Sequence, residues 1–180
     1  MLRGELENQI LAIFFVAKEP VTFFQLQEIY PSATTQDLKE ALQHLISNFN
    51  SSQKAMEIRE VGGGYRMTSL PEHHEIIHSY LKTRPSSKLS LAALETLSVI
   101  AYKQPVTVPE IIEIRGVRGT STIRTLLEKK LIEIRGRKTV VGRPIMYGTS
   151  KDFLLHFGLK NLSDLPTLDE LEEVLSQPTT

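Results

Sequence analysis

The residues most suggestive of chemistry are His74-Glu75-Ile76-Ile77-His78, which fit the H-E-x-x-H pattern of zinc metalloproteases. On a helix the two histidines lie one turn apart on one face, where both could bind zinc while Glu75 activates a water. The third ligand has to come from elsewhere, and only Glu95 has a plausible place. Since His73 next to the motif favours a polar helix face over a shaped cleft, we expect no metal site here.

Other reactive patterns are missing from the sequence. There is no cysteine, which excludes thiol catalysis, disulfides and thiolate metal sites and suits a reducing compartment. There is also no G-x-x-x-x-G-K-[ST] phosphate loop and no G-x-S-x-G elbow. Isolated histidines such as His44 and His156 are far more often structural than catalytic. We therefore expect no enzyme, no cofactor and no small-molecule substrate.

Charge is distributed unevenly along a chain whose formal net charge is zero. Residues 1–83 carry a net charge of −3, residues 84–150 carry +7, and residues 151–180 carry −4. The apolar run Ile10–Ala17 is much shorter than the roughly 20 residues that span a bilayer. We expect a cytoplasmic protein without a membrane segment and with a basic middle region.

The sequence contains a weak internal repeat. Ala17-Lys18-Glu19-Pro20-Val21-Thr22 matches Tyr102-Lys103-Gln104-Pro105-Val106-Thr107 at an offset of 85, and apolar positions on both sides keep this register. Later, Glu57-Ile58-Arg59 matches Glu133-Ile134-Arg135 at an offset of 76. Two copies of one small domain explain this pattern better than chance.

Each copy predicts three helices followed by two strands. Apolar spacing and capping residues place the helices of the first copy near 4–17, 23–29 and 35–48, with Thr22 and Thr34 as N-caps. Alternation places its strands at 56–61 and 65–68, joined by Gly62-Gly63-Gly64. In the second copy, Ser90 and Thr107 begin two helices, and Gly116 ends the second of them. The predicted elements of the second copy are helices near 91–103, 108–115 and 121–130 and strands near 131–135 and 145–149.

This order of elements predicts a mainly α (α+β) protein made of two tandem winged-helix domains, each with three helices and a two-stranded wing. The expected boundaries are a first domain at 1–83, a linker at 84–88, a second domain at 89–160 and a partly flexible acidic tail at 161–180. Short helices are expected near 71–82 and at 151–157, the latter ended by Gly158.

Several motifs resemble the segregation and condensation protein B (ScpB) family. The match is dense over about residues 90–166 and follows the family's first domain in order and spacing over 5–83. The clearest segments are Ile100-Ala101-Tyr102-Lys103-Gln104-Pro105-Val106-Thr107, Ile114-Arg115-Gly116-Val117, Gly142-Arg143-Pro144, Tyr147-Gly148-Thr149 and Gly62-Gly63-Gly64-Tyr65-Arg66. The chain departs from the family pattern at Arg118-Gly119-Thr120, where a small or acidic stretch is usual.

The resemblance implies a non-enzymatic subunit of the bacterial SMC condensin-like complex. Members of the family pair through their first domains and bind the kleisin ScpA through their second, and they reach the SMC ATPase through the kleisin. The implied role is chromosome condensation and segregation at the nucleoid.

Residue patterns indicate where such contacts could lie. The first helix is apolar on two sides. Leu6, Ile10, Ile13 and Ala17 suit the core, while a second stripe predicts a homodimer contact through Leu11 and Phe15, with Phe24 as a further candidate. The alternative is that the helix between the two domains covers this second stripe. For the kleisin we expect a basic surface with apolar neighbours in the second domain. The residues expected there are Arg115, Arg118, Arg124, Arg137, Lys138, Arg143 and Tyr147.

The main alternative is a DNA-binding transcriptional regulator, because winged helices commonly read the major groove with the third helix. In the second copy this helix offers Arg124, Lys129 and Lys130, which permits such a role, whereas the third helix of the first copy is acidic. We expect weak nonspecific DNA contact rather than sequence-specific binding.

Overall fold

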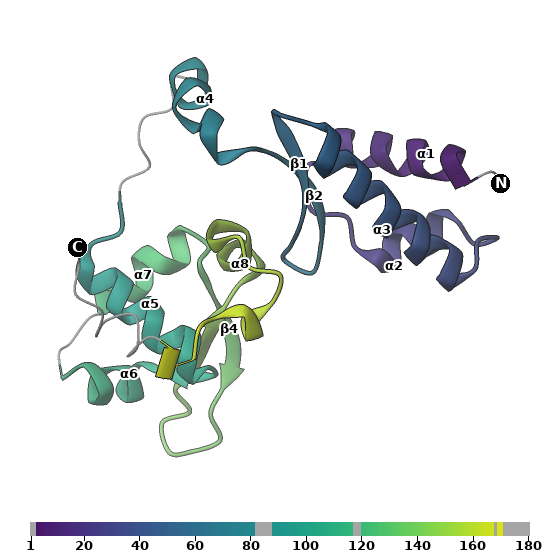
Figure 1. Cartoon of the computed structure of the whole chain (residues 1–180). Coiled ribbons are helices and arrows are strands. Elements are labelled where there is room, and N and C mark those ends of the chain that lie inside the picture. The colour runs from purple at the N-terminus through teal and green to yellow at the C-terminus, as the bar shows by residue number, and fades with distance from the viewer. Residues whose placement is uncertain (1–2, 82–87, 117–119, 168, 171–180) are drawn as a thin grey trace. The chain divides into compact units, whose positions relative to one another are not determined.

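The computed structural model of the chain describes residues 3–81, 88–116, 120–167 and 169–170. It divides into two compact units, Met1–Ser86 and Ser87–Thr180 (Figure 1). Both are mostly helical with a small antiparallel sheet. Of the predicted linker 84–88, only Lys88 belongs to the described residues.

Unit 1 contains three helices followed by a hairpin, as the sequence predicts. The elements are α1 (Arg3–Val16), α2 (Phe23–Ile29), α3 (Thr35–Ser52), β1 (Met56–Val61), β2 (Gly64–Ser69), a 3-10 turn η1 (Pro71–His73) and α4 (His74–Leu81). β1 and β2 pair antiparallel from Met56↔Ser69 to Val61↔Gly64. Gly62 and Gly63 make the turn at φ values of 59° and 76°, which favour glycine.

The predicted N-caps of unit 1 are confirmed. The Thr22 hydroxyl accepts the Gln25 backbone N–H, and the Gln25 side chain accepts the Thr22 N–H at 2.8 Å. The Thr34 hydroxyl accepts the Asp37 N–H at 3.1 Å in the same way. α3 runs four residues beyond its predicted end at residue 48, and the Asn50 side chain exchanges two hydrogen bonds with the backbone of Ile58 in β1.

The core of unit 1 lies between α1, α2, α3 and the hairpin. Its most buried members include Ile10, Leu26 and Leu38. In α1, Leu6 and Ile10 are buried as predicted, the predicted core residues Ile13 and Ala17 are partly buried and pack against the core, and Phe14, which was not predicted, is buried. The remaining buried residues of this cluster are Leu6, Val21, Ala41, Leu42, Leu45 and Ile58.

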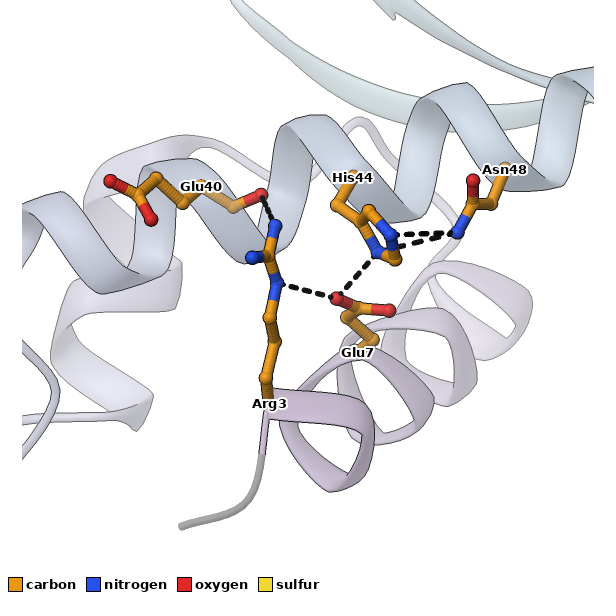
Figure 2. Close-up of polar contacts among 5 residues, drawn as sticks. All are labelled: Arg3, Glu7, Glu40, His44 and Asn48. Atoms are coloured by element: carbon orange, nitrogen blue, oxygen red, sulfur yellow. Dashed lines mark hydrogen bonds and ion pairs between the residues drawn. The ribbon is translucent and has the colours of Figure 1, made fainter.

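A polar network fixes α1 against α3 outside this core (Figure 2). The Glu7 carboxylate lies 3.2 Å from the Arg3 Nε and 2.9 Å from the His44 Nδ1. Arg3 also donates to the Glu40 carbonyl at 3.1 Å, and the Asn48 amide lies against the His44 ring. Because Glu7 and Arg3 lie two turns or more from the C-terminal end of α1, that end is free of this network.

Unit 2 repeats the order of unit 1. The elements are α5 (Leu91–Lys103), β3 (Val106–Thr107), α6 (Val108–Arg115), α7 (Thr120–Glu128), β4 (Ile132–Arg137), β5 (Ile145–Thr149), α8 (Lys151–Phe157) and a 3-10 turn η2 (Leu162–Asp164). The sheet has the order β3-β5-β4, with all pairs antiparallel. Ser90 caps α5, and Gly116 and Gly158 end α6 and α8 in the left-handed conformation, as predicted.

Positions 85 residues apart perform the same task in the two units. Val21 forms an isolated bridge with Tyr65, and its counterpart Val106 pairs with Tyr147. The next residue in each unit, Thr22 or Thr107, is the N-cap of the second helix. This third, very short strand was not predicted, because two residues give no alternating pattern.

The described residues immediately after the predicted boundary at residue 160 pack on unit 2. Leu165 lies against its core, and the Tyr102 hydroxyl donates to the Pro166 carbonyl at 2.7 Å. Thr167 and Glu170 form a capping box. The rest of the predicted tail, residues 168 and 171–180, lies outside the described residues.

Candidate protein-binding surfaces

His74, Glu75 and His78 of the H-E-x-x-H motif lie on α4 and are exposed. The rings of His74 and His78 are 6.1 Å apart between centroids, but the expected third ligand, Glu95, belongs to unit 2 and binds Arg115 at 2.6 Å. Within residues 3–81, 88–116, 120–167 and 169–170, no three histidine, aspartate or glutamate side chains gather where one metal ion could bind them. The described residues therefore do not build the zinc centre of a metalloprotease.

The first candidate surface is a set of exposed apolar side chains at the end of α1 and the start of α2. It consists of Phe15, Val16 and Phe24, which are 73%, 72% and 66% exposed. We call these three residues the α1–α2 patch. α1 ends at Val16 because the chain then runs through Pro20 to the N-cap Thr22, so both helices present aromatic side chains near this connection. Exposed apolar groups of this size indicate an interaction site.

The expected dimer residues do not all belong to this patch. Phe15 and Phe24 do, but Leu11 is partly buried and packs against the core of unit 1. The sequence analysis did not identify Val16, because this residue belongs to neither of the two apolar stripes predicted for the first helix. The shift of the buried stripe to Phe14 explains both differences, since each residue turns a helix by about 100°.

The second candidate surface lies on the β4–β5 hairpin of unit 2. Ile134, Val140 and Val141 are exposed there, and Val141 is 103% exposed. Arg137 and Arg143 are exposed beside them. We call these five residues the hairpin surface. It combines three apolar side chains with two positive charges, which suits an acidic partner that also carries apolar side chains.

Hydrogen bonds within the hairpin hold this surface in shape. The Lys138 N–H donates to the Pro144 carbonyl and the Arg143 N–H to the Val140 carbonyl, both at 2.9 Å. Arg137 donates from Nη1 to the Arg143 carbonyl at 3.1 Å. The loop 138–144 is therefore closed on itself and presents its two valines outward.

Lys138 connects the hairpin to α6. Its ammonium group binds the Glu110 carboxylate, whose other oxygen accepts the N–H and the hydroxyl of Thr107 at 2.8 Å and 2.7 Å. The Lys138 hydrogen bond, followed by those from Thr107, lowers the pKa of Glu110 from 4.5 to about 2. One carboxylate thus caps α6 and anchors the hairpin.

Two residues expected at the partner surface are buried, which corrects that expectation. The side chain of Arg115 is only 7% exposed and binds Glu95 and the Thr96 hydroxyl, at 2.6 Å and 2.7 Å. Tyr147 lies in the core of unit 2, where β5 pairs on both sides. Both side chains hold unit 2 together and are not available to a partner.

The remaining predicted contacts are dispersed. Arg124 is exposed on α7 but pairs with Glu128 one turn later, at 2.8 Å. Arg118 lies outside the described residues. The structure therefore brings together Arg137, Lys138 and Arg143, whereas Arg115, Arg124 and Tyr147 lie elsewhere on unit 2.

None of the described helices is both long and apolar enough to cross a bilayer.

Comparison with known proteins agrees with the motifs in the sequence. The family described as segregation and condensation complex subunit ScpB matches residues 8–168. A segregation and condensation protein B from Clostridium tetani is 42% identical over 164 residues, which cover 91% of this chain and 86% of that protein. A protein of the same name from Alkaliphilus metalliredigens is 38% identical over 173 residues, covering 96% and 90% of the two chains. The chain therefore belongs to the ScpB family of segregation and condensation complex subunits.

Among solved structures, the crystal structure of ScpB from Mycobacterium tuberculosis is similar to this chain. The two are 28% identical with a TM-score of 0.42, over 88% of this chain and 98% of that one.

Proposed function

We propose that the chain is a non-enzymatic scaffold subunit that pairs with a second copy and binds the kleisin ScpA, through which it contacts the SMC ATPase. In this proposal residues 1–83 and 89 onward form tandem winged-helix domains whose wings are the β1–β2 and β4–β5 hairpins. Family membership and the repeated order of three helices and a hairpin support it. The role is chromosome condensation and segregation in the cytoplasm, at the nucleoid.

The homodimer is proposed to use the α1–α2 patch. Burying an exposed aromatic side chain contributes on the order of 2 kcal/mol, so two phenylalanines and a valine per copy form a sufficient apolar centre for association. Replacing Phe15 with aspartate should convert the dimer to monomers in sedimentation at micromolar concentration. Ser47→Asp, which adds the same charge at an exposed position of α3, is the matched control. A Phe15→Asp protein that still sediments as a dimer would contradict the proposal.

Kleisin binding is proposed to use the hairpin surface, and the observation that carries this is its fixed combination of Val140 and Val141 with Arg137 and Arg143. The apolar residues supply affinity, since their contact with a partner removes water from both. The arginines speed association with an acidic segment.

The experiment is a binding measurement of ScpA to the full chain carrying Arg137→Glu and Arg143→Glu. We expect at least a tenfold loss of affinity, mainly through slower association at low salt. Lys88→Glu with Lys103→Glu makes the same change of net charge at exposed positions of unit 2 outside the hairpin, and should bind nearly as the unchanged protein does. Equal binding by both double variants would refute a role for the hairpin arginines.

A DNA-binding regulator is the competing proposal, and the basic hairpin is the observation that favours it. Pairing of Arg124 with Glu128 weakens the case for α7 as a base-reading helix. Weak nonspecific contact through Arg137 and Arg143 is compatible with the scaffold role. Duplex binding whose affinity falls steeply with salt and differs between sequences would favour the regulator.

A further inference from the structure

α4 is an amphipathic helix whose apolar side lies open. Ile76, Tyr80 and Leu81 are 68%, 84% and 61% exposed, and no residue of the helix is buried. These three residues lie within a 140° arc of the helix, while His74, Glu75 and His78 occupy the rest. α4 packs against η1, the turn that precedes it.

An eight-residue helix needs cover for such a face, because isolated helices shorter than about 12 residues are marginal in water. Apolar side chains at one-turn spacing typically seat in a groove or on a second apolar surface. Both α4 and the α1–α2 patch belong to unit 1, and both remain exposed in it. α4 therefore does not cover the patch of its own chain.

The two surfaces match in size and chemistry. Each offers three large apolar side chains, and each includes at least one aromatic ring. An aromatic residue buries roughly 150–250 Å² of surface. The three residues of the patch and the three of α4 in one copy together therefore bury on the order of 800 Å². That is about what one partner contributes to a standard protein–protein interface.

We propose that, in the homodimer, α4 of each copy docks on the α1–α2 patch of the other. This proposal rests on the proposed homodimer and names what covers its patch. A two-fold axis forms the same contact twice, so one symmetric dimer closes all four surfaces. Neither surface is then left to bind further copies, which limits assembly to two chains.

The absence of native cysteine allows a direct test with full-length chains. One chain carries Phe24→Cys and a second, ¹⁵N-labelled chain carries Tyr80→Cys. They are mixed, allowed to exchange, and treated with a short bis-maleimide. Mass spectrometry then separates the mixed pair from the two like pairs. We expect the mixed pair to dominate.

The control is a chain carrying Gln43→Cys, which takes the place of one of the two cysteine variants. Gln43 is an exposed residue of α3 that belongs to neither surface, so this mixture should give little cross-linking. Cross-linking of like pairs alone, or none while sedimentation still shows a dimer, would overturn the docking of α4 but leave the homodimer standing. If the unchanged chain sediments as a monomer, both the docking of α4 and the homodimer are overturned.

A second measurement uses Tyr80→Asp, which should weaken dimerisation by about 30-fold or more, the effect of losing an aromatic anchor from an interface centre. Ser79→Asp places the same charge on the neighbouring exposed residue and should change the dissociation constant much less. Equal dissociation constants for these two variants would count against the proposal even if the Phe15→Asp variant is monomeric.

Discussion

At the scale of single residues, the type of a side chain did not reveal where it acts. Arg115 and Arg137 are both arginines of a basic domain, yet one is buried against α5 and the other lies at an exposed hairpin. Arg115 follows a helical pattern that places it one turn after Ile111, a core residue, and this spacing could have signalled burial. Arg137 has no such core neighbour, because every residue of β4 after Ile132 is exposed.

Replacing Arg115 with alanine should lower the stability of unit 2 by about 2 kcal/mol, because hydrogen bonds to Thr96 and Glu95 are lost and a buried side chain is deleted. Arg124→Ala removes an exposed pair and should cost no more than about 0.5 kcal/mol. Urea unfolding of the two variants would measure both values. Equal losses would show that burial does not distinguish these arginines.

At the scale of elements, the sequence predicted best what depends on neighbouring residues. The N-caps at Thr22, Thr34, Ser90 and Thr107 are local hydrogen-bonding patterns, and each begins a helix where expected. The strand at Val106 depends on pairing with a segment some 40 residues later, so no local pattern indicated it. In α1, apolar residues occur on nearly every side, so the sequence did not single out the most buried positions, and Phe14 is buried while Ile13 packs at the edge of the core.

The link between α6 and the β4–β5 hairpin should weaken in acid. The bond from Lys138 lowers the pKa of Glu110 to about 2, so the folded state favours the charged carboxylate. Its contribution to stability is therefore complete above the ordinary value of 4.5 and is lost as the pH falls towards 2.

Glu110→Gln should consequently be less stable than the unchanged protein above about pH 5, and the difference should shrink as the pH falls from 4.5 towards 2. Urea unfolding at a series of pH values measures it. Glu113→Gln, at an exposed carboxylate of the same helix, serves as the comparison. A stability difference for Glu110→Gln that is as large at pH 2 as at pH 6 would contradict the assignment.

At the scale of the whole molecule, each unit has its own apolar core, and chains of this length with such a core commonly fold alone. We predict that residues 1–86 expressed alone sediment as a dimer without binding ScpA, and that residues 87–180 bind ScpA as a monomer. Sedimentation and a binding titration of each fragment test this. Dimerisation of the second fragment, or ScpA binding confined to the first, would reverse the assignment of roles.

The two candidate surfaces were predictable to different degrees. Phe15, Phe24, Arg137 and Arg143 were identified because apolar and charged residues stand out in sequence. Val16 and Val141 were not, since an apolar residue at a helix end or in a loop is equally consistent with burial. Only the tertiary structure shows that nothing in their own unit covers them.

The short bridge beside each second helix has a mechanical consequence. In both units the residue that joins the sheet, Val21 or Val106, is followed at once by the N-cap threonine. A loop of several residues would absorb a small displacement of the hairpin, whereas two adjacent residues transmit it to the helix. A ligand that displaces the second hairpin should therefore tilt the first turn of α6. The chemical shift of the Thr107 amide should change on binding, although Thr107 itself does not contact the ligand.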